Sequence, residues 1–303
     1  MFPPDQYSLL DFGSGRKLER FGGVLVDRPS PPAAPFVPAA CGVWTQADLR
    51  FEEDAGGKEG ASGRRGRWIP LTGRGEKAAG ESWPIRHENA ALVLELKGSP
   101  FGHLGVFPEQ SRNWDAIAAA CRDGKKRLGR PLRVLNLFAY TGGSSLAAAS
   151  GGAEVTHLDA AQNIVRQARR NAELSGLAGH PIRWIADDAV KFVRREKKRG
   201  TVYDGIILDP PTYGHGARGE VWRLTRDLPG LLDDLFAILA DDAPFVLLTC
   251  HSPGFDALRL RSLLAERMRG HFPDGTRIES GPIPLFSEQK RRLPGGDMAF
   301  IKR

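Results

Sequence analysis

Cysteine is scarce in this chain. Its 303 residues include three cysteines, Cys41, Cys121 and Cys250, an odd number without the close spacing of metal ligands. A disulfide framework and a zinc site are therefore not expected, and a cytoplasmic, reducing location is predicted. No apolar run reaches the roughly 18 residues that span a bilayer, and the first residues lack the basic and apolar regions of a signal peptide. We expect neither a membrane partner nor a bound metal.

The turn most typical of nucleotide binding lacks spaced glycines. A strand-forming run, residues 134–138, ends in a turn that carries Gly142 and Gly143 side by side, and small residues at helical spacing follow. A strand, a glycine turn and a helix are the opening unit of a nucleotide-binding sheet. Because the Gly-x-Gly-x-x-Gly spacing that admits a pyrophosphate is missing here, a nicotinamide or flavin oxidoreductase is disfavoured. We predict that the ligand of this chain binds at residues 138–143.

Charge is distributed unevenly along the chain. Residues 1–100 carry 13 basic and 13 acidic side chains, whereas residues 101–303 carry 30 basic against 23 acidic ones and so account for the net charge of +7. The apolar share of 41% is that of an ordinary globular protein. A basic carboxyl-terminal region favours a polyanionic partner, although charge does not determine the fold.

The same boundary separates two kinds of pattern. Residues 1–100 contain short apolar bursts broken by glycines and prolines, which predict a small β-rich domain or cap, with a possible strand at residues 42–49. In residues 101–303, strand and helix patterns alternate with short connections, which predicts a doubly wound parallel α/β sheet. Within it, residues 122–130 are expected to be a basic link and residues 222–239 a single helix.

Acidic residues follow two of the predicted strands. Asp159 ends the second strand, and an acid at this distance from the glycine turn hydrogen-bonds the ribose hydroxyls of a bound nucleoside. The alternative for Asp159 is a surface acid beside an ordinary tight turn. Asp187 and Asp188 follow the third strand, where one carboxylate can accept the amine of an adenine ring and the other can cap the next helix.

The most specific pattern is Asp209-Pro-Pro211, which follows the apolar run of residues 206–208. The two prolines fix φ and lack N–H groups, so we expect nearby carbonyl groups to remain available for the amine hydrogens of a planar substrate. A simple turn is the alternative, but such a turn rarely needs two prolines after a buried strand.

Taken in order, the glycine turn, Asp159, Asp188-Ala189 and Leu208-Asp-Pro-Pro211 resemble the class I S-adenosylmethionine-dependent methyltransferases. Within them, the chain is most similar to the bacterial 23S ribosomal RNA 5-methylcytosine methyltransferase group. The resemblance covers residues 101–303. It implies a seven-stranded, Rossmann-like sheet, S-adenosyl-L-methionine as cofactor and ribosomal RNA as partner. The cofactor-binding residues that it implies are Phe107, Gln110, Phe138, Ala139, Tyr140, Thr141, Gly142, Gly143, Asp159, Ala160, Asp187, Asp188 and Asp209.

Cys250 follows the fifth predicted strand, and in the resembling group a cysteine at this point is the nucleophile. Carbon 5 of cytosine becomes nucleophilic only after a thiolate adds to carbon 6; it then takes the methyl group, and a base removes the proton. His251 and Asp209 are candidates to assist this chemistry. The group typically has Ser-Cys-Ser here, whereas this chain has Thr249-Cys-His251. The alternative is a buried cysteine that packs as a small hydrophobe. The implied catalytic residues are Cys250, Asp209, Pro210 and Pro211.

Basic residues are predicted at both edges of the sheet, and only those at the carboxyl edge lie on the side of the ligand site. Residues 125–133 and 191–199 lead into strands and are expected at the amino edge as solvated faces, whereas cations that follow strands can contact phosphates. Aromatic residues near these cations, Trp222 and Phe286 among them, can stack on an unpaired base or lie in the core. The candidates for substrate binding are Tyr213, Arg218, Arg223, Lys290 and Arg291.

The predicted function is transfer of a methyl group from S-adenosylmethionine to a base in RNA, with carbon 5 of cytosine favoured. One alternative is an amine-directed methyltransferase, because Asp209-Pro-Pro211 followed by Tyr213 is similar to the Asp-Pro-Pro-Tyr pattern of that class, in which no cysteine is required. Tyr213 is displaced from that pattern by one residue, so this is the minor alternative. Another is a non-catalytic RNA-binding or assembly factor that keeps the cofactor pocket. Asp209 together with Cys250 favours the enzyme.

Overall fold

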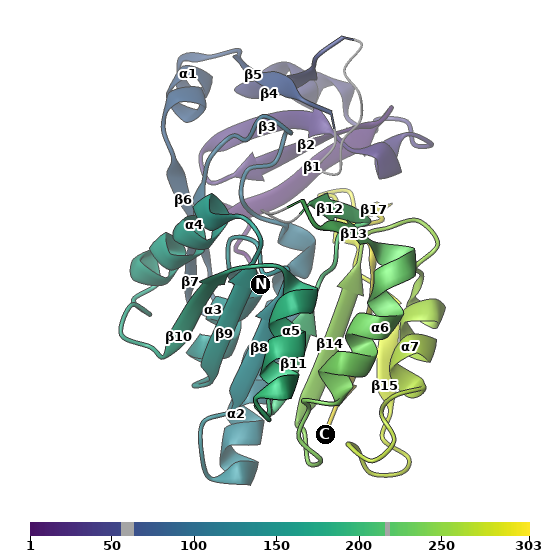
Figure 1. The fold of residues 1–303 in the computed structure, drawn as a ribbon. Coiled ribbons are helices and arrows are strands. Elements are labelled where there is room, and N and C mark those ends of the chain that lie inside the picture. The colour runs from purple at the N-terminus through teal and green to yellow at the C-terminus, as the bar shows by residue number, and fades with distance from the viewer. Residues whose placement is uncertain (56–63, 216–218) are drawn as a thin grey trace. The chain divides into compact units, whose positions relative to one another are not determined.

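The computed structural model describes residues 1–55, 64–215 and 219–303. These form two compact units (Figure 1): unit 1 is Met1–Ser111 with Pro284–Gly295, and unit 2 is Arg112–Ile283 with Gly296–Arg303. The domain boundary predicted at residue 100 differs from this division, because residues 101–111 and Pro284–Gly295 pack within unit 1. We keep a two-domain organisation as a proposal, with the bounds of the two units.

Unit 1 is built on a five-stranded sheet in the order β1-β2-β3-β4-β5, antiparallel except for the parallel pair β3 and β4. The predicted β-rich amino-terminal region is confirmed. The strands are β1 Tyr7–Gly13, β2 Arg16–Phe21, β3 Val24–Pro29, β4 Leu49–Glu53 and β5 Gly66–Pro70. Helix α1 Gly73–Gly80 and two further pairs, β6 Trp83–His87 with β7 Leu92–Leu96 and β16 Leu285–Phe286 with β17 Arg292–Leu293, complete it.

The strand expected at residues 42–49 is wrong. Cys41–Gln46 forms a short 3₁₀ helix, and only Leu49 belongs to a strand. Trp44 explains the difference, because its indole N–H donates to the buried Asp11 carboxylate at 2.9 Å while the residue packs against the buried cluster of Leu10, Leu18, Leu25 and Ala47. A tight turn satisfies both contacts.

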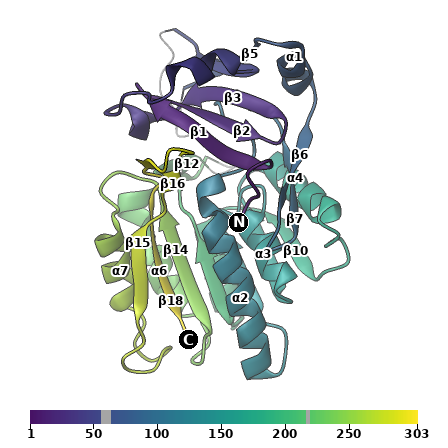
Figure 2. The same ribbon diagram turned by 180° about the vertical axis from the view of Figure 1, so that it is seen from behind.

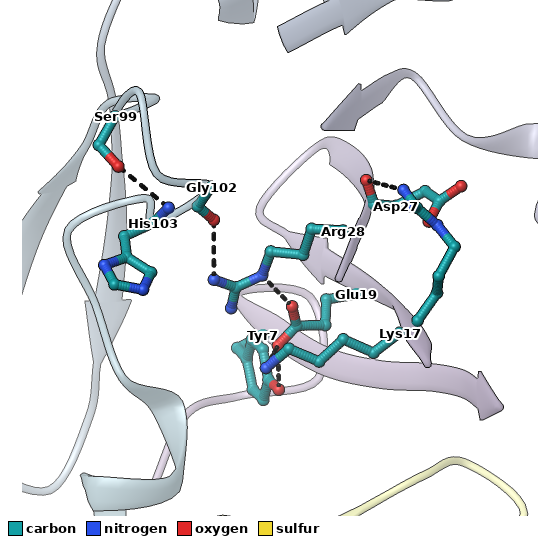
Figure 3. Close-up of polar contacts among 9 residues, drawn as sticks. Tyr7, Lys17, Glu19, Asp27, Arg28, Ser99, Gly102 and His103 are labelled. Atoms are coloured by element: carbon teal, nitrogen blue, oxygen red, sulfur yellow. Dashed lines mark hydrogen bonds and ion pairs between the residues drawn. The ribbon is translucent and has the colours of Figure 1, made fainter. Parts of the chain in front are cut away.

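Unit 1 also contains a buried cluster of charged side chains around Glu19 (Figure 3). Glu19 is fully buried and accepts from Arg28 Nε at 2.6 Å and from the Tyr7 hydroxyl at 2.8 Å, while Lys17 Nζ lies 3.1 Å away. Burial alone would raise the pKa of Glu19, but the Arg28 and Lys17 cations lower it to about 2. Arg28 also donates to the Gly102 carbonyl, so the cluster fastens a loop to the sheet.

Unit 2 contains a seven-stranded sheet in the order β10-β9-β8-β11-β14-β18-β15, and this confirms the predicted doubly wound α/β fold. Strand β18 runs antiparallel to its two neighbours, β14 and β15, and the other pairs of neighbouring strands are parallel. The strands are β8 Arg133–Leu137, β9 Glu154–Asp159, β10 Ile182–Ala186, β11 Gly205–Leu208, β14 Phe245–Cys250, β15 Ile278–Pro282 and β18 Asp297–Lys302.

Helices cover both faces of this sheet. In Figure 1, α5 and α6 lie in front of it, and in Figure 2, from behind, α2 lies in front. One continuous apolar cluster joins the strands to leucines and phenylalanines of α5, α6 and α7. The helices are α2 Ser111–Leu128, α3 Gly143–Ser150, α4 Gln162–Leu174, α5 Ala189–Lys198, α6 Leu224–Phe236 and α7 Ala257–Ala265. No described helix is both long enough and apolar enough to cross a membrane.

Two predicted elements of unit 2 are wrong in part. The expected basic link at residues 122–130 is helical as far as Leu128, because basic side chains suit the last turn of a helix and Gly129, at φ +68°, ends it. The single helix expected at residues 222–239 starts only at Leu224. The residues before it form β13 Val221–Arg223, which pairs with β12 Tyr213–His215.

Candidate active site

The carboxyl ends of four adjacent parallel strands meet at one edge of the unit 2 sheet. Leu137 of β8 pairs with Leu158 of β9 and with Leu208 of β11. Leu208 pairs in turn with Leu248 of β14. The residues that follow these positions are therefore brought together at the edge where ligands bind in open α/β sheets. They are the turn of residues 138–143, Asp159, Asp209 and Cys250.

The turn after β8 has backbone φ angles that residues with a side chain rarely adopt. Phe138 and Tyr140 have positive φ values of 54° and 49°, and Gly142 has φ 94°. Positive φ costs a residue with a Cβ atom free energy, so such residues persist only where the surroundings hold them. The Asp159 carboxylate does so here, since its Oδ2 accepts the Tyr140 N–H at 2.9 Å.

Asp159 is both a structural anchor and a candidate ligand. Its Oδ1 accepts the Ala161 N–H at 3.0 Å, so each carboxylate oxygen receives one backbone donor. Burial raises the pKa of Asp159, and the backbone N–H groups of Ala161 and Tyr140 oppose that rise. An ionised carboxylate has about four acceptor sites, so further donors, such as two ribose hydroxyls, can still be accommodated.

The paired glycines make room for helices. A Cβ atom on Gly142 would lie 3.1 Å from the Cβ of Ala168, and one on Gly143 would lie 2.5 Å from the ring of Trp114. The first glycine thus lets α4 approach the turn, and the second lets α2 approach the start of α3. Sequence reasoning linked both glycines to a ligand and did not anticipate these contacts.

A buried polar chain beneath the turn was missed. Asn136 donates to the Ser145 hydroxyl at 2.9 Å, and that hydroxyl is 2.9 Å from His157 Nδ1. Asn171 Nδ2 donates to the carbonyl of Thr141 at 2.9 Å. Burial lowers the pKa of His157 to about 3, so its ring is neutral at pH 7. The sequence carries a signal for this chain, because a polar residue interrupts the apolar residues of each strand: Asn136 in β8 and His157 in β9.

The two acidic residues after β10 have different partners. Asp188 caps α5 by accepting the Lys191 N–H at 2.8 Å, which confirms that one of the pair is a helix cap. Asp187 accepts the Asp188 N–H with one oxygen and the Arg195 guanidinium with the other. Asp188 Oδ2 remains the oxygen better suited to an adenine amine, and that role stays a prediction.

The Asp-Pro-Pro segment is fixed by the hairpin that follows it. The indole N–H of Trp222 donates to the Pro211 carbonyl at 2.7 Å, and the Trp222 ring lies 5.0 Å from that of Phe138. The Pro211 carbonyl therefore already accepts one hydrogen bond, and its availability to a substrate amine through its second lone pair stays a prediction. Trp222, 8% exposed, belongs to the core and does not offer its ring to an unpaired base.

Cys250 lies at the end of β14 and is 1% exposed. Burial raises the pKa of its thiol, and the Asp209 and Asp297 carboxylates raise it further, while hydrogen bonds from Ser252 oppose them. The thiol form therefore predominates at neutral pH. His251 is the next residue, and its Nε2 lies 3.4 Å from Asp209 Oδ2.

Predicted substrate residues fall in both units. In unit 2, Tyr213 is half-buried in β12, and the side chain of Arg223 is exposed. Arg218 lies outside the described residues. In unit 1, Lys290 is exposed, whereas the guanidinium of Arg291 donates to Asp11 at 2.9 Å and to backbone carbonyls. These assignments stay predictions.

The predicted cofactor residues Phe107 and Gln110 also belong to unit 1. The ring of Phe107 lies 5.5 Å from that of His103, and Gln110 is buried at the end of a 3₁₀ turn. Their contact with a cofactor stays a prediction.

A cavity of about 560 Å³ opens at the opposite edge of the unit 2 sheet. Its lining includes Arg133, Glu154 and Arg183, at the amino ends of β8, β9 and β10. Because it lies away from Asp159, Asp209 and Cys250, it is not the candidate site. No cluster of His, Cys, Asp and Glu side chains suited to a metal ion occurs in residues 1–55, 64–215 and 219–303.

Comparison with known proteins identifies similar chains. A family model described as S-adenosylmethionine-dependent methyltransferase matches residues 115–262. A crystal structure of a SAM-dependent methyltransferase from Agrobacterium tumefaciens is 37% identical and has a TM-score of 0.86; the match covers 98% of this chain and 90% of that one.

Curated relatives share a shorter stretch. Ribosomal RNA large subunit methyltransferase I of Aeromonas hydrophila is 40% identical over 168 residues, which is 55% of this chain and 40% of the relative. The protein of the same name from Klebsiella pneumoniae is 28% identical over 226 residues, 69% of this chain and 51% of the relative. The chain thus spans about half, or less, of the length of these relatives.

Proposed function

This chain belongs to the S-adenosylmethionine-dependent methyltransferases, and from that premise we propose that it methylates carbon 5 of a cytosine in ribosomal RNA. The observation that carries the proposal is the meeting of Asp159, Asp209-Pro-Pro211 and Cys250 at one sheet edge. The curated relatives, named as ribosomal RNA methyltransferases, support the substrate class. The proposal places the protein in the cytoplasm, with its RNA.

The residues of this edge fit the cofactor of the family. Asp159 has acceptor capacity for ribose hydroxyls, Asp188 Oδ2 suits an adenine amine, and the turn of residues 138–143 has no spaced glycines to receive a pyrophosphate. When bound, S-adenosylmethionine supplies an electrophilic methyl group. The protein's part is to hold the acceptor base beside Asp209-Pro-Pro211 and to activate its carbon 5.

Cys250 provides that activation in the proposal. Its thiol loses a proton, and the sulfur forms a bond to carbon 6 of the cytosine, which makes carbon 5 nucleophilic. Because the pKa of Cys250 is raised, deprotonation is part of the cost of this step. Burial of the sulfur also keeps competing electrophiles away until a base is placed against it.

The test is methyl transfer from labelled S-adenosylmethionine to unmodified total RNA, with the product nucleoside identified by mass spectrometry. We expect 5-methylcytidine, and we expect Cys250→Ser to abolish turnover while cofactor affinity stays unchanged. If no label is incorporated although the cofactor binds, the chain is an RNA-binding or assembly factor instead. The loss of 5-methylcytidine at one rRNA position in cells without the protein would identify the site.

One observation favours a second candidate, an amine-directed methyltransferase. Cys250 is deeply buried with a raised pKa, whereas Asp209-Pro-Pro211 and the half-buried Tyr213 suffice for the chemistry of that class. Retained activity in Cys250→Ser, with the label on an exocyclic nitrogen, would establish it in place of the first.

A further inference from the structure

We propose that His251 and Asp209 together form the base that removes the carbon 5 proton and so releases the methylated RNA from Cys250. This inference rests on the proposed carbon 5 function and assigns its last step. The motivating observation is that Nε2 of His251 lies 3.4 Å from Oδ2 of Asp209, directly beside the candidate nucleophile.

The pair occupies the right place in the fold. Asp209 is the first residue after β11 and His251 the first after β14, and these two strands are neighbours in parallel register. Their side chains are 31% and 35% exposed, whereas Cys250 is 1% exposed. A nucleobase bound at this edge of the sheet therefore meets a partly exposed imidazole and a partly exposed carboxylate.

Gly296 holds the imidazole in position from the other side. A Cβ atom at residue 296 would lie 2.8 Å from Nδ1 of His251 and 2.7 Å from the carbonyl oxygen of Cys250. Its φ of +106° is one that glycine adopts readily. The backbone entering β18 thus packs against the ring, whose Nε2 faces the Asp209 carboxylate.

The chemistry requires such a base. Once the Cys250 sulfur is bonded to carbon 6 and carbon 5 carries the methyl group, aromaticity returns only when the carbon 5 proton leaves. The Asp209 carboxylate takes this proton and passes it to Nε2 of His251, while the C–H electron pair forms the carbon 5–carbon 6 double bond and the carbon–sulfur bond breaks to return a thiolate. The carboxylate of Asp209 stabilises the imidazolium that forms. Solvent then takes the proton from the partly exposed ring.

The experiment follows the covalent RNA–protein adduct. RNA is incubated with the full-length protein and labelled cofactor, and adducts are separated on a denaturing gel. We expect His251→Asn to accumulate methylated adduct and to release product about 10²- to 10⁴-fold more slowly than wild type, which is the range that general base catalysis contributes. His180→Asn, a change at an exposed histidine of the same unit, should release product like wild type.

Two further measurements fix the interpretation. Added imidazole should restore release from the His251→Ala adduct, which a merely structural role would not allow. RNA containing 5-fluorocytosine, which has no proton to lose at carbon 5, should trap wild type and His251→Asn alike. If wild type is not trapped, the carbon 5 function itself fails. If wild type is trapped but His251→Asn turns over normally or loses trapping, only the assignment of this step is overturned.

Discussion

At the scale of single residues, the ionisation of Cys250 depends on its neighbours across the sheet. Asp297 is its partner in the β14–β18 register, and Asp209 follows the adjacent strand β11. Both carboxylates raise the pKa of the thiol, in addition to burial. The site therefore stores its nucleophile as an unreactive thiol, and the balance of charge around the sulfur sets the pH at which it reacts.

Asp297→Asn should increase the reactivity of Cys250. Removing one carboxylate lowers the thiol pKa, so the rising limb of the pH–rate profile should move to lower pH. The rate of iodoacetamide modification of Cys250, followed by mass spectrometry, measures this directly, with the exposed Cys41 as internal reference. An unchanged rate at Cys250 in the variant would show that Asp297 does not control its ionisation.

His157 should make unit 2 sensitive to acid. Its pKa is about 3 in the folded protein against 6.5 in a model peptide, so the unfolded state binds a proton first as pH falls. This contribution to stability is fully present above pH 6.5 and is lost as pH falls toward 3, with a slope of at most about 1.4 kcal/mol per pH unit. In urea titrations between pH 7 and 5, His157→Asn should show a smaller loss than wild type. His180→Asn should retain the wild-type slope, and equal slopes in all three proteins would contradict the assignment.

At the scale of elements, the β12–β13 hairpin supports the Asp-Pro-Pro segment. Trp222 joins the two, through its hydrogen bond to the Pro211 carbonyl and its packing on Phe138. A short strand pair thus links the proposed substrate segment to the proposed cofactor turn. This link lies within unit 2, and Trp222, which makes it, is not itself proposed to do chemistry.

Trp222→Phe should loosen this link and preserve its aromatic packing. The Pro211 carbonyl would lose its donor, which costs about 0.5–1.5 kcal/mol, since Pro211 is exposed and water can replace the indole N–H. We expect a lower free energy of unfolding in urea and slower methyl transfer. Cofactor affinity in calorimetry should stay within a few-fold of wild type, because Asp159 is untouched. Wild-type stability and rate together would show that the hydrogen bond is dispensable.

The elements also show what the sequence could predict. Parallel strands end at a common edge, so Asp159, Asp209 and Cys250 could be placed together from their positions after apolar runs. The reasons for Gly142 and Gly143 could not, because Ala168 and Trp114, which they accommodate, lie about 25–30 residues away along the chain. The raised pKa of Cys250 was likewise hidden, since it depends first on the burial of the thiol and then on the Asp209 and Asp297 carboxylates, the second of which belongs to β18.

At the scale of the whole molecule, unit 1 is formed by two separate segments of the chain. Pro284–Gly295 leaves the unit 2 sheet between β15 and β18 and joins the amino-terminal strands. There Leu285 and Leu293 are buried in one cluster with Leu9 and Phe12. Unit 1 is therefore incomplete without a segment that lies nearly at the end of the sequence.

A fragment of residues 112–303 should contain this segment without its partners. Leu285 and Leu293 would be exposed, so we expect rapid proteolytic cleavage within residues 284–295 and binding of a hydrophobic dye. The intact chain, treated in parallel, is the control and should resist cleavage at these positions. Equal resistance in the fragment would mean that the segment is held by something other than the strands of unit 1.

The same segment determines when unit 1 can be finished during synthesis. Ser287 forms a bridge with Leu9, and Arg291 donates to Asp11 across a separation of 280 residues. Strand β1 must wait until residues 284–295 are translated, some tens of seconds later at about 5–20 residues per second. Throughout that interval Leu9 and Phe12 of β1 lack the cover of Leu285 and Leu293, so apolar surface stays exposed on the nascent chain.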